Sequence, residues 1–179
     1  MVVEPDNFAP ITPPVTTNWL AIAAPDYSRE QMLKYRAGAN SGDSVEERDT
    51  KWMSEELQDL RSNAFHDLFR TAHAGFSMAK KCAGSRPLTV HTGPLGCGVF
   101  KNSVTLSTAA QLLAAKIVGV DSLHFYDVDN AANNAVKFDS IKEIVDTETQ
   151  PAAHNRTVRD VLESVLTALS TKARTRAAP

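Results

Sequence analysis

The segment Val90-His91-Thr92-Gly93-Pro94-Leu95-Gly96-Cys97-Gly98-Val99-Phe100-Lys101-Asn102 places three of the chain's eight glycines within six residues. An apolar stretch precedes these glycines and a helical pattern follows them, so they lie in a strand-to-helix connection. Glycine in such a loop permits positive φ angles and close approach of an oxyanion to backbone N–H groups. The following helix is expected to add its dipole and free N–H groups. The segment therefore predicts either a phosphate site or a tight turn whose glycines serve packing alone.

Two common phosphate-binding loops are excluded by the spacing. A P-loop needs a lysine and a hydroxyl residue directly after its last glycine, and this sequence has neither there. The dinucleotide-binding fingerprint needs a third glycine where this chain has Lys101.

Short apolar runs predict three strands, at residues 19–24, 88–91 and 122–126. The first run has no polar alternation and is stopped by Pro25, so we expect a strand buried on both faces. Strands that alternate with one-sided helices are typical of an α/β fold, a mixed sheet with parallel core strands flanked by helices.

Apolar residues at helical spacing predict the helices between these strands. Two helices are expected within residues 50–83, with Gly84 and Pro87 as the stop signal. The others are expected over 27–33, from Ser103 or Thr105 to Gly119, around 138–145 and over 158–171.

Composition limits the classes of function. The chain has 179 residues, 42% of them hydrophobic and 22% charged, which is typical of a folded domain. A formal charge of −2 argues against a general nucleic-acid-binding surface. The sequence shows no apolar run of about 20 residues and no secretory pattern, so we expect no membrane partner and an intracellular location, cytoplasmic or nuclear. Composition leaves the oligomeric state open.

Three regions are expected along the chain. Residues 1–17 contain Pro5, Pro10, Pro13 and Pro14 and predict an extended arm. Residues 18–150 hold the alternating elements, and residues 151–179 a final helix with a basic tail. Basic residues suit a helix C-terminus and need no ligand to explain them.

Beyond the glycines of the loop, the sequence of residues 91–103 and 105–129 resembles the C-terminal half of the poly(ADP-ribose) glycohydrolase macrodomain. That family's loop reads Thr-Gly-Asn-Trp-Gly-Cys-Gly-Ala-Phe, followed by an alanine- and leucine-rich helix with a glutamine and then an aromatic strand. Residues 69–76 and 22–25 resemble an earlier helix and core strand of the family, so the resemblance covers roughly residues 18–129. The matching loop positions are Thr92, Gly93, Gly96, Cys97, Gly98 and Phe100.

The resemblance implies a macrodomain-like fold and an ADP-ribose site, with ADP-ribose or an ADP-ribosylated protein as partner and no separate cofactor. The backbone of Gly96, Cys97, Gly98 and Val99 would cradle the diphosphate, and Phe100 would pack on the distal ribose. Gly93 and Pro94 would shape the entrance of the loop. Near the adenine, the resemblance places Phe125 or Tyr126, with Asp127 as an acceptor for an amino or hydroxyl group.

The chain also departs from the family. Pro94-Leu95 replaces the Asn-Trp pair, and Asp127 replaces an aromatic residue. The catalytic signature of that family, a glycine run followed by Gln-Glu-Glu, does not occur, and Glu46-Glu47 and Glu55-Glu56 are expected on solvated surfaces. Cleavage of a ribosidic bond requires a carboxyl group that protonates the leaving oxygen and activates water. We therefore expect a binding protein in which hydrolysis is open, or a truncated copy or fragment of an enzyme.

Two further chemistries are consistent with the residue types. Cys97 near a helix N-terminus could serve as a nucleophile, with His91 or His124 as its base. His66 and His73 share a helix face and could bind a metal ion together with Asp67 and His91, although such histidines also serve as packing residues. Cys82, near the end of the helical pattern over residues 50–83, is predicted to be a small buried hydrophobic residue.

Overall fold

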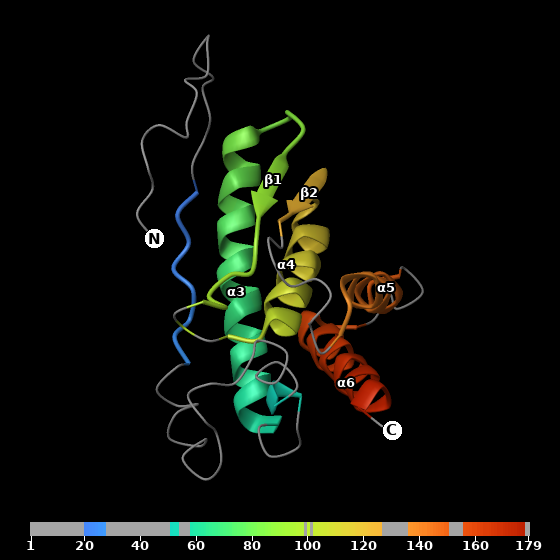
Figure 1. Cartoon of the computed structure of the whole chain (residues 1–179). Helices are drawn as coiled ribbons and strands as arrows, with labels where there is room; N and C mark the ends of the chain where they lie inside the picture. The colour runs from blue at the N-terminus through green and yellow to red at the C-terminus, as the bar shows by residue number, and fades with distance from the viewer. Residues whose placement is uncertain are drawn as a thin grey trace, which may run out of the picture.

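The computed structural model describes residues 20–27, 51–53, 58–98, 100, 102–126, 136–150 and 156–177. Within them it is a mixed α/β structure, as the alternation of apolar patterns predicts (Figure 1). Its elements are α3 (Gln58–Ala83), β1 (Thr89–Thr92), α4 (Val104–Val118), β2 (Ser122–Phe125), α5 (Phe138–Glu148) and α6 (Val158–Ala177).

The described sheet consists of β1 and β2, which run parallel in the register Thr89↔Ser122 to Thr92↔Phe125. Helix α4 connects the two strands, because parallel neighbours need a crossover and a helix supplies it. Both strands lie within a residue of their predicted bounds, and the predicted parallel pairing is confirmed.

The strand predicted at residues 19–24 does not form in the described part of the chain. Residues 20–27 are irregular, and Leu20 remains 43% exposed. This segment runs along α3 in Figure 1 and packs on it through Ile22, whose Cδ1 lies 2.4 Å from where a Cβ on Gly75 would stand. The segment lies across a groove from β1 and pairs with no described strand, so its apolar side chains pack on α3 without a β ladder.

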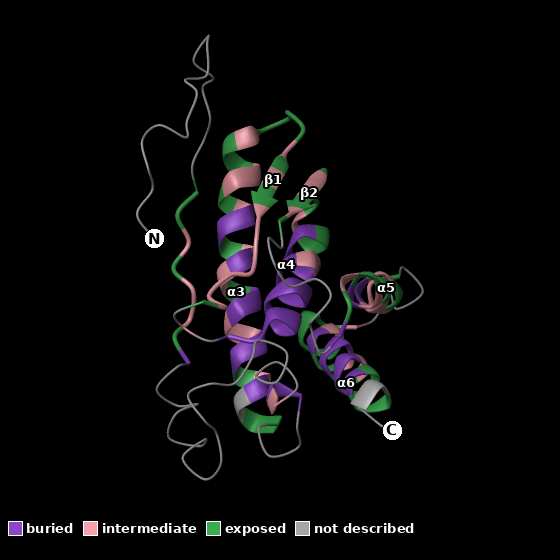
Figure 2. Cartoon of the chain, in the orientation of Figure 1, coloured by how far each residue is buried: buried purple, intermediate pink, exposed green. Residues whose placement is uncertain are grey.

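Helix α4 is the centre of the helical layer and is buried along most of its length, as the purple ribbon in Figure 2 shows. It packs against α3 on one side and α5 on another, while α6 contacts α5 and α3. A helix without a polar face is typical of a core position. Of the apolar stripe predicted for α6, Leu162, Val165, Leu166 and Leu169 are buried, whereas Val158 at its start is 47% exposed.

The predicted helix ends are confirmed by their capping residues. The Ser103 hydroxyl accepts a hydrogen bond from Leu106 N–H at 3.1 Å, so Ser103 and not Thr105 is the N-cap of α4. Gly119 ends α4 with a φ of 73°, and Gly84 follows α3 with a φ of 62°. Helix α3 is unbroken from Gln58 to Ala83, and Lys51 and Trp52 before it are also helical. Helix α6 continues to Ala177, beyond its predicted end at Thr171.

Some predictions lie outside the described residues. They are the arm at 1–17, the helix at 27–33 apart from the non-helical Tyr27, and the two glutamate pairs at 46–47 and 55–56. None of the helices in the described ranges combines the length and hydropathy needed to cross a bilayer.

Asp121 ties the beginnings of the two strands together. Its Oδ2 accepts hydrogen bonds from Leu88 N–H at 2.8 Å and from Lys80 Nζ at 2.7 Å. These two bonds, the one from Leu88 first, hold the pKa of Asp121 below its ordinary value of 3.8.

A depressed carboxyl pKa stabilises the fold above pH 3.8 and ceases to do so as the pH falls through the lowered value. We therefore expect Asp121→Asn to lower the urea midpoint of unfolding at neutral pH, and the difference from the unchanged chain to vanish in strong acid. Glu163→Gln, which alters an exposed carboxylate on α6, is the control. A difference that persists unchanged in acid would contradict a role for the Asp121 charge.

Candidate functional site

The glycine loop, residues 93–98, begins where β1 ends, beside the residue that follows β2. Tyr126 N–H donates to Thr92 O at 2.8 Å, and a Cβ on Gly93 would lie 2.9 Å from Tyr126 O. A side chain at Gly93 would therefore force these two chain segments apart. Loop and Tyr126 meet at the carboxyl edge of the sheet, where ligands of parallel α/β folds bind.

Gln111 of α4 holds this loop from beneath. Its side chain is 2% exposed, and Nε2 donates to Gly93 O at 2.9 Å and to Ser107 O at 3.2 Å. Its Oε1 accepts a hydrogen bond from the Thr92 hydroxyl. Ser107 Oγ donates to Leu95 O at 3.1 Å, so two side chains of one helix hold the end of β1 and the first half of the loop.

Gly96 is a second position at which the loop requires glycine, here for its φ angle as well as for space. Its φ is 73°, and a Cβ there would lie 2.4 Å from Asn102 Nδ2 and 2.7 Å from Ala24 Cβ. Asn102 closes the turn, because its N–H donates to Gly96 O at 3.1 Å and its Nδ2 donates to Pro25 O at 2.9 Å. The loop is thus joined to the segment at residues 20–27.

Gly98 differs from Gly96 in both respects. Its φ lies outside the left-handed region, and a Cβ added to it would meet no atom within 4 Å. The residue is exposed, and its N–H has no hydrogen-bond partner among the described residues. We expected the loop glycines to adopt positive φ angles. This expectation is confirmed at Gly96 and wrong at Gly93 and Gly98. Open space at Gly98 gives a ligand access to the backbone.

The first turn of α4 is not open to a ligand, contrary to the expectation from the sequence. Val104 is 5% exposed and Leu106 0%, and Ser103 Oγ already accepts the Leu106 N–H. The sequence analysis missed this burial because it results from α4 lying at the centre of the helical layer. Near its first turn, Val136 N–H donates to Thr105 Oγ1 at 3.4 Å.

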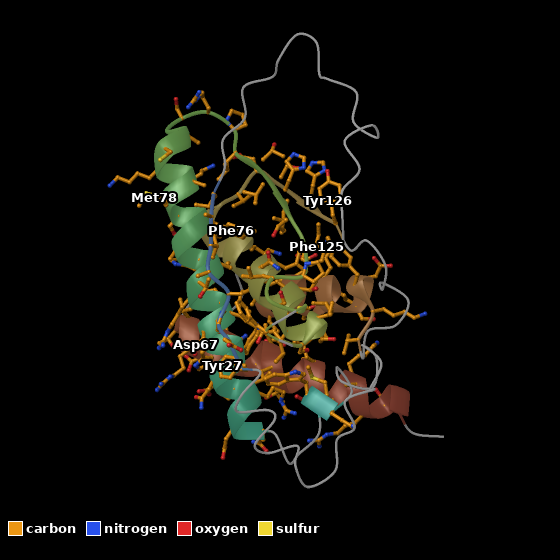
Figure 3. All side chains as sticks on the ribbon, turned by 60° about the vertical axis from the view of Figure 1, so that its left-hand side comes forward. Tyr27, Asp67, Phe76, Met78, Phe125 and Tyr126 are labelled. Atoms are coloured by element: carbon orange, nitrogen blue, oxygen red, sulfur yellow. The ribbon has the colours of Figure 1, made fainter. Side chains whose placement is uncertain are left out.

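The two aromatic residues at the end of β2 have different surroundings. Phe125 is half-buried and packs against Phe138 of α5, with ring centroids 5.8 Å apart. Tyr126 is 53% exposed, and Figure 3 shows Phe125 nearer to the helices than Tyr126. Of the two residues considered for an aromatic contact with a ligand, only Tyr126 presents an exposed ring.

Tyr126 belongs to a stack of rings on the outer face of the sheet. Its hydroxyl lies 2.9 Å from His91 Nδ1, and the two rings are stacked with centroids 5.7 Å apart. His91 also stacks on His124, at 4.8 Å, because the two residues are register partners in β1 and β2. The sequence analysis considered each histidine as a base and missed the stack, since the strand register creates it.

Other predicted site residues are placed as follows. Pro94, Cys97 and Phe100 are half-buried in the loop region, while Val99 and Asp127 lie outside the described residues. Cys97 Sγ donates to Leu95 O at 3.6 Å. This contact does not test the nucleophilic role considered for Cys97, which stays a prediction.

Two interpretations at α3 are corrected. Among the described residues no three histidine, cysteine or acidic side chains lie close enough to hold a metal ion, so the alternative of a metal site at His66, Asp67, His73 and His91 is not supported. Cys82 is exposed and not buried, because it lies on the last turn of α3 beside a groove that no described residue fills.

Comparisons with known proteins identified no relative. No family model, curated protein or solved structure matches the chain. Any function proposed for the glycine loop therefore rests on its geometry and on the resemblance of its sequence.

The contrast between Gly96 and Gly98 predicts that substitution by alanine destabilises the fold at Gly96 but not at Gly98. Gly96→Ala is expected to lower the free energy of unfolding by about 1–3 kcal/mol, because a left-handed residue and a crowded Cβ are both strained. Gly98→Ala is the matched control and should leave that free energy unchanged. Urea unfolding measures both, and equal effects at the two positions would contradict the loop geometry.

Gln111 is the second position that we expect to be sensitive. Gln111→Leu keeps the size of the side chain but removes the partners of Gly93 O and the Thr92 hydroxyl. We expect a loss of about 1–3 kcal/mol in the free energy of unfolding, the cost of buried polar groups left unpaired. Gln150→Leu at the exposed end of α5 is the control, and an equally small loss for both variants would show that Gln111 is not an anchor.

Proposed function

We propose that this chain binds ADP-ribose through the segment at residues 93–100, as the resemblance to the poly(ADP-ribose) glycohydrolase macrodomain implies. The observation that carries the proposal is Gly98, an exposed glycine whose N–H has no partner in the described residues and whose Cβ position is open. A diphosphate needs backbone N–H groups that it can approach closely, and a Cβ would obstruct that approach.

The rest of the loop supports this role by holding the backbone in place. Gln111 and Asn102 fix the two sides of the turn around Gly96, so the position of Gly98 does not have to be organised by the ligand. A preformed site lowers the entropy lost on binding. Diphosphate binding is assigned to the loop alone, since the first turn of α4 is buried.

Tyr126 is the residue to which we assign the adenine. Its backbone lies beside Gly93, its ring is exposed on the outer face of the sheet, and an exposed aromatic face offers a purine a stacking partner. We assign the distal ribose to Phe100, as the resemblance implies.

We propose binding without hydrolysis. A loop of backbone N–H groups can position a diphosphate but cannot supply the proton that a departing ribose oxygen requires. The sequence lacks the glycine run and the Gln-Glu-Glu signature that provide the acid in the family. We assign the chain the role of a reader, which holds ADP-ribose on a modified protein without cleaving it.

Calorimetric titration with ADP-ribose tests the binding site. Gly98→Glu is expected to abolish binding, because the carboxylate occupies the diphosphate site and repels its charge. Gly98→Gln separates bulk from charge and should retain more affinity than Gly98→Glu. Both variants should fold normally, which circular dichroism checks, since the Cβ position is open.

A release assay on an ADP-ribosylated protein tests the second part of the proposal. Binding without release supports a reader. Release of ADP-ribose that disappears when an acidic residue is changed would show a hydrolase instead. Absence of binding by the unchanged chain, or normal binding by Gly98→Glu, would rule out the diphosphate assignment.

A further inference from the structure

A groove of about 1060 Å³ runs along the free side of β1, bounded by α3 and by the segment at residues 20–22. Its walls are mainly apolar, with Leu20 and Ile22 on one side and Val90 and Leu95 on the other. Phe76 of α3 contributes to the lining, and Leu20 is one of the large apolar residues that stay exposed. Apolar surface of this kind marks a binding site more often than ordinary protein surface does.

The side of β1 that faces this groove carries unpaired peptide groups. The carbonyls of Leu88 and Thr92 accept hydrogen bonds from Ser122 and Tyr126, on the β2 side. Successive peptide groups of a strand point to opposite sides, so the N–H and C=O of Thr89 and His91 point toward the groove. No described residue forms a backbone hydrogen bond with these groups.

The two long walls of the groove run in the same direction. Ile22 contacts Gly75 on α3, and Tyr27 donates a hydrogen bond to Asp67, so residues 20–27 run antiparallel to α3. Strand β1 returns along α3 after the turn at Gly84 and is therefore parallel to residues 20–27 (Figure 1). Residues 20–27, α3 and β1 therefore follow the path of a crossover unit, with an irregular segment in the place of its first strand.

We propose that this groove receives one extended, apolar β-strand from a second polypeptide, which pairs with the free side of β1. An extended peptide is the partner whose backbone offers donors and acceptors at the spacing of Thr89 and His91, and its alternate apolar side chains would meet the apolar walls. Parallel strands are normally paired on both sides and buried, so β1 as described is an incomplete core strand.

The undescribed parts of this chain are poor candidates for the occupant. The 19 residues before Leu20 contain four prolines, which leave no proline-free stretch longer than the five residues 15–19. Proline is excluded from central strands because it lacks the N–H. Residues 28–50 and 127–135 are rich in charged and amide side chains and do not show the alternating apolar pattern of a buried strand.

The test uses the full chain and a blocked peptide of alternating valine and threonine, about six residues long to match a typical strand. We expect the peptide to bind, measured by fluorescence polarisation, and to slow hydrogen exchange at the amides of Thr89 and His91. The same peptide with N-methylated backbone amides should not bind, because it cannot donate to the strand.

Two variants locate the binding in the groove. Ala79→Trp fills the groove from α3 and should abolish peptide binding, whereas Ala74→Trp, on an exposed face of α3 outside the groove, should not. Thr89→Pro removes an N–H that faces the groove without breaking the pairing with β2, and it should weaken binding even if Ala79→Trp disturbs folding.

Four results would overturn the proposal. The first is no binding by the peptide, and the second is equal binding by the N-methylated peptide. The third is that the amides of Thr89 and His91 are already protected in the free chain. The fourth is a dimer of the chain that Ala79→Trp dissociates. Protection in the free chain would assign the groove to a segment of this chain, and such a dimer would assign it to a second copy.

Discussion

The side chain of Gln111 joins the sheet to the helical layer, and the shape of the candidate site depends on it. Its amide forms hydrogen bonds with the Thr92 hydroxyl, the Gly93 carbonyl and the Ser107 carbonyl, and Gln111 is only 2% exposed to solvent. A buried amide that satisfies several partners specifies one arrangement, since any displacement leaves polar groups unpaired. Strand β1 therefore ends at a defined point, and the glycine loop leaves it in a defined direction.

The same loop forms the boundary between two surfaces of different chemistry. On one side Gly98 and Tyr126 are exposed at the carboxyl edge of the sheet, the place proposed for ADP-ribose. On the other side Leu95 lines the apolar groove along β1. Asn102 and Gly96 hold the loop against Ala24 and Pro25, so the segment that forms the far wall of the groove also fixes the turn.

Local signals predicted the helices well. Ser103, Gly84 and Gly119 act at helix ends through hydrogen bonds and φ angles that involve only neighbouring residues, and the structure confirms all three. The predictions that failed concern contacts distant in sequence. The run at 19–24 has the composition of a buried strand but pairs with no described strand, and Cys82 is exposed because no described residue covers it in the groove. The first turn of α4 is buried by neighbours that no local pattern identifies.

The sequence by itself determined the helices from α3 onward, the two strands β1 and β2 and the position of the glycine loop, because periodicity and capping are properties of short segments. It also determined the chemistry proposed for the loop, through the residues at 92–100. Only the tertiary structure decided which glycine is required and which is open, since that depends on Asn102 and Ala24 lying against Gly96 and nothing lying against Gly98. The stack of His91, His124 and Tyr126 and the free side of β1 were likewise decided there, because strand register and unpaired peptide groups exist only once distant segments are packed together.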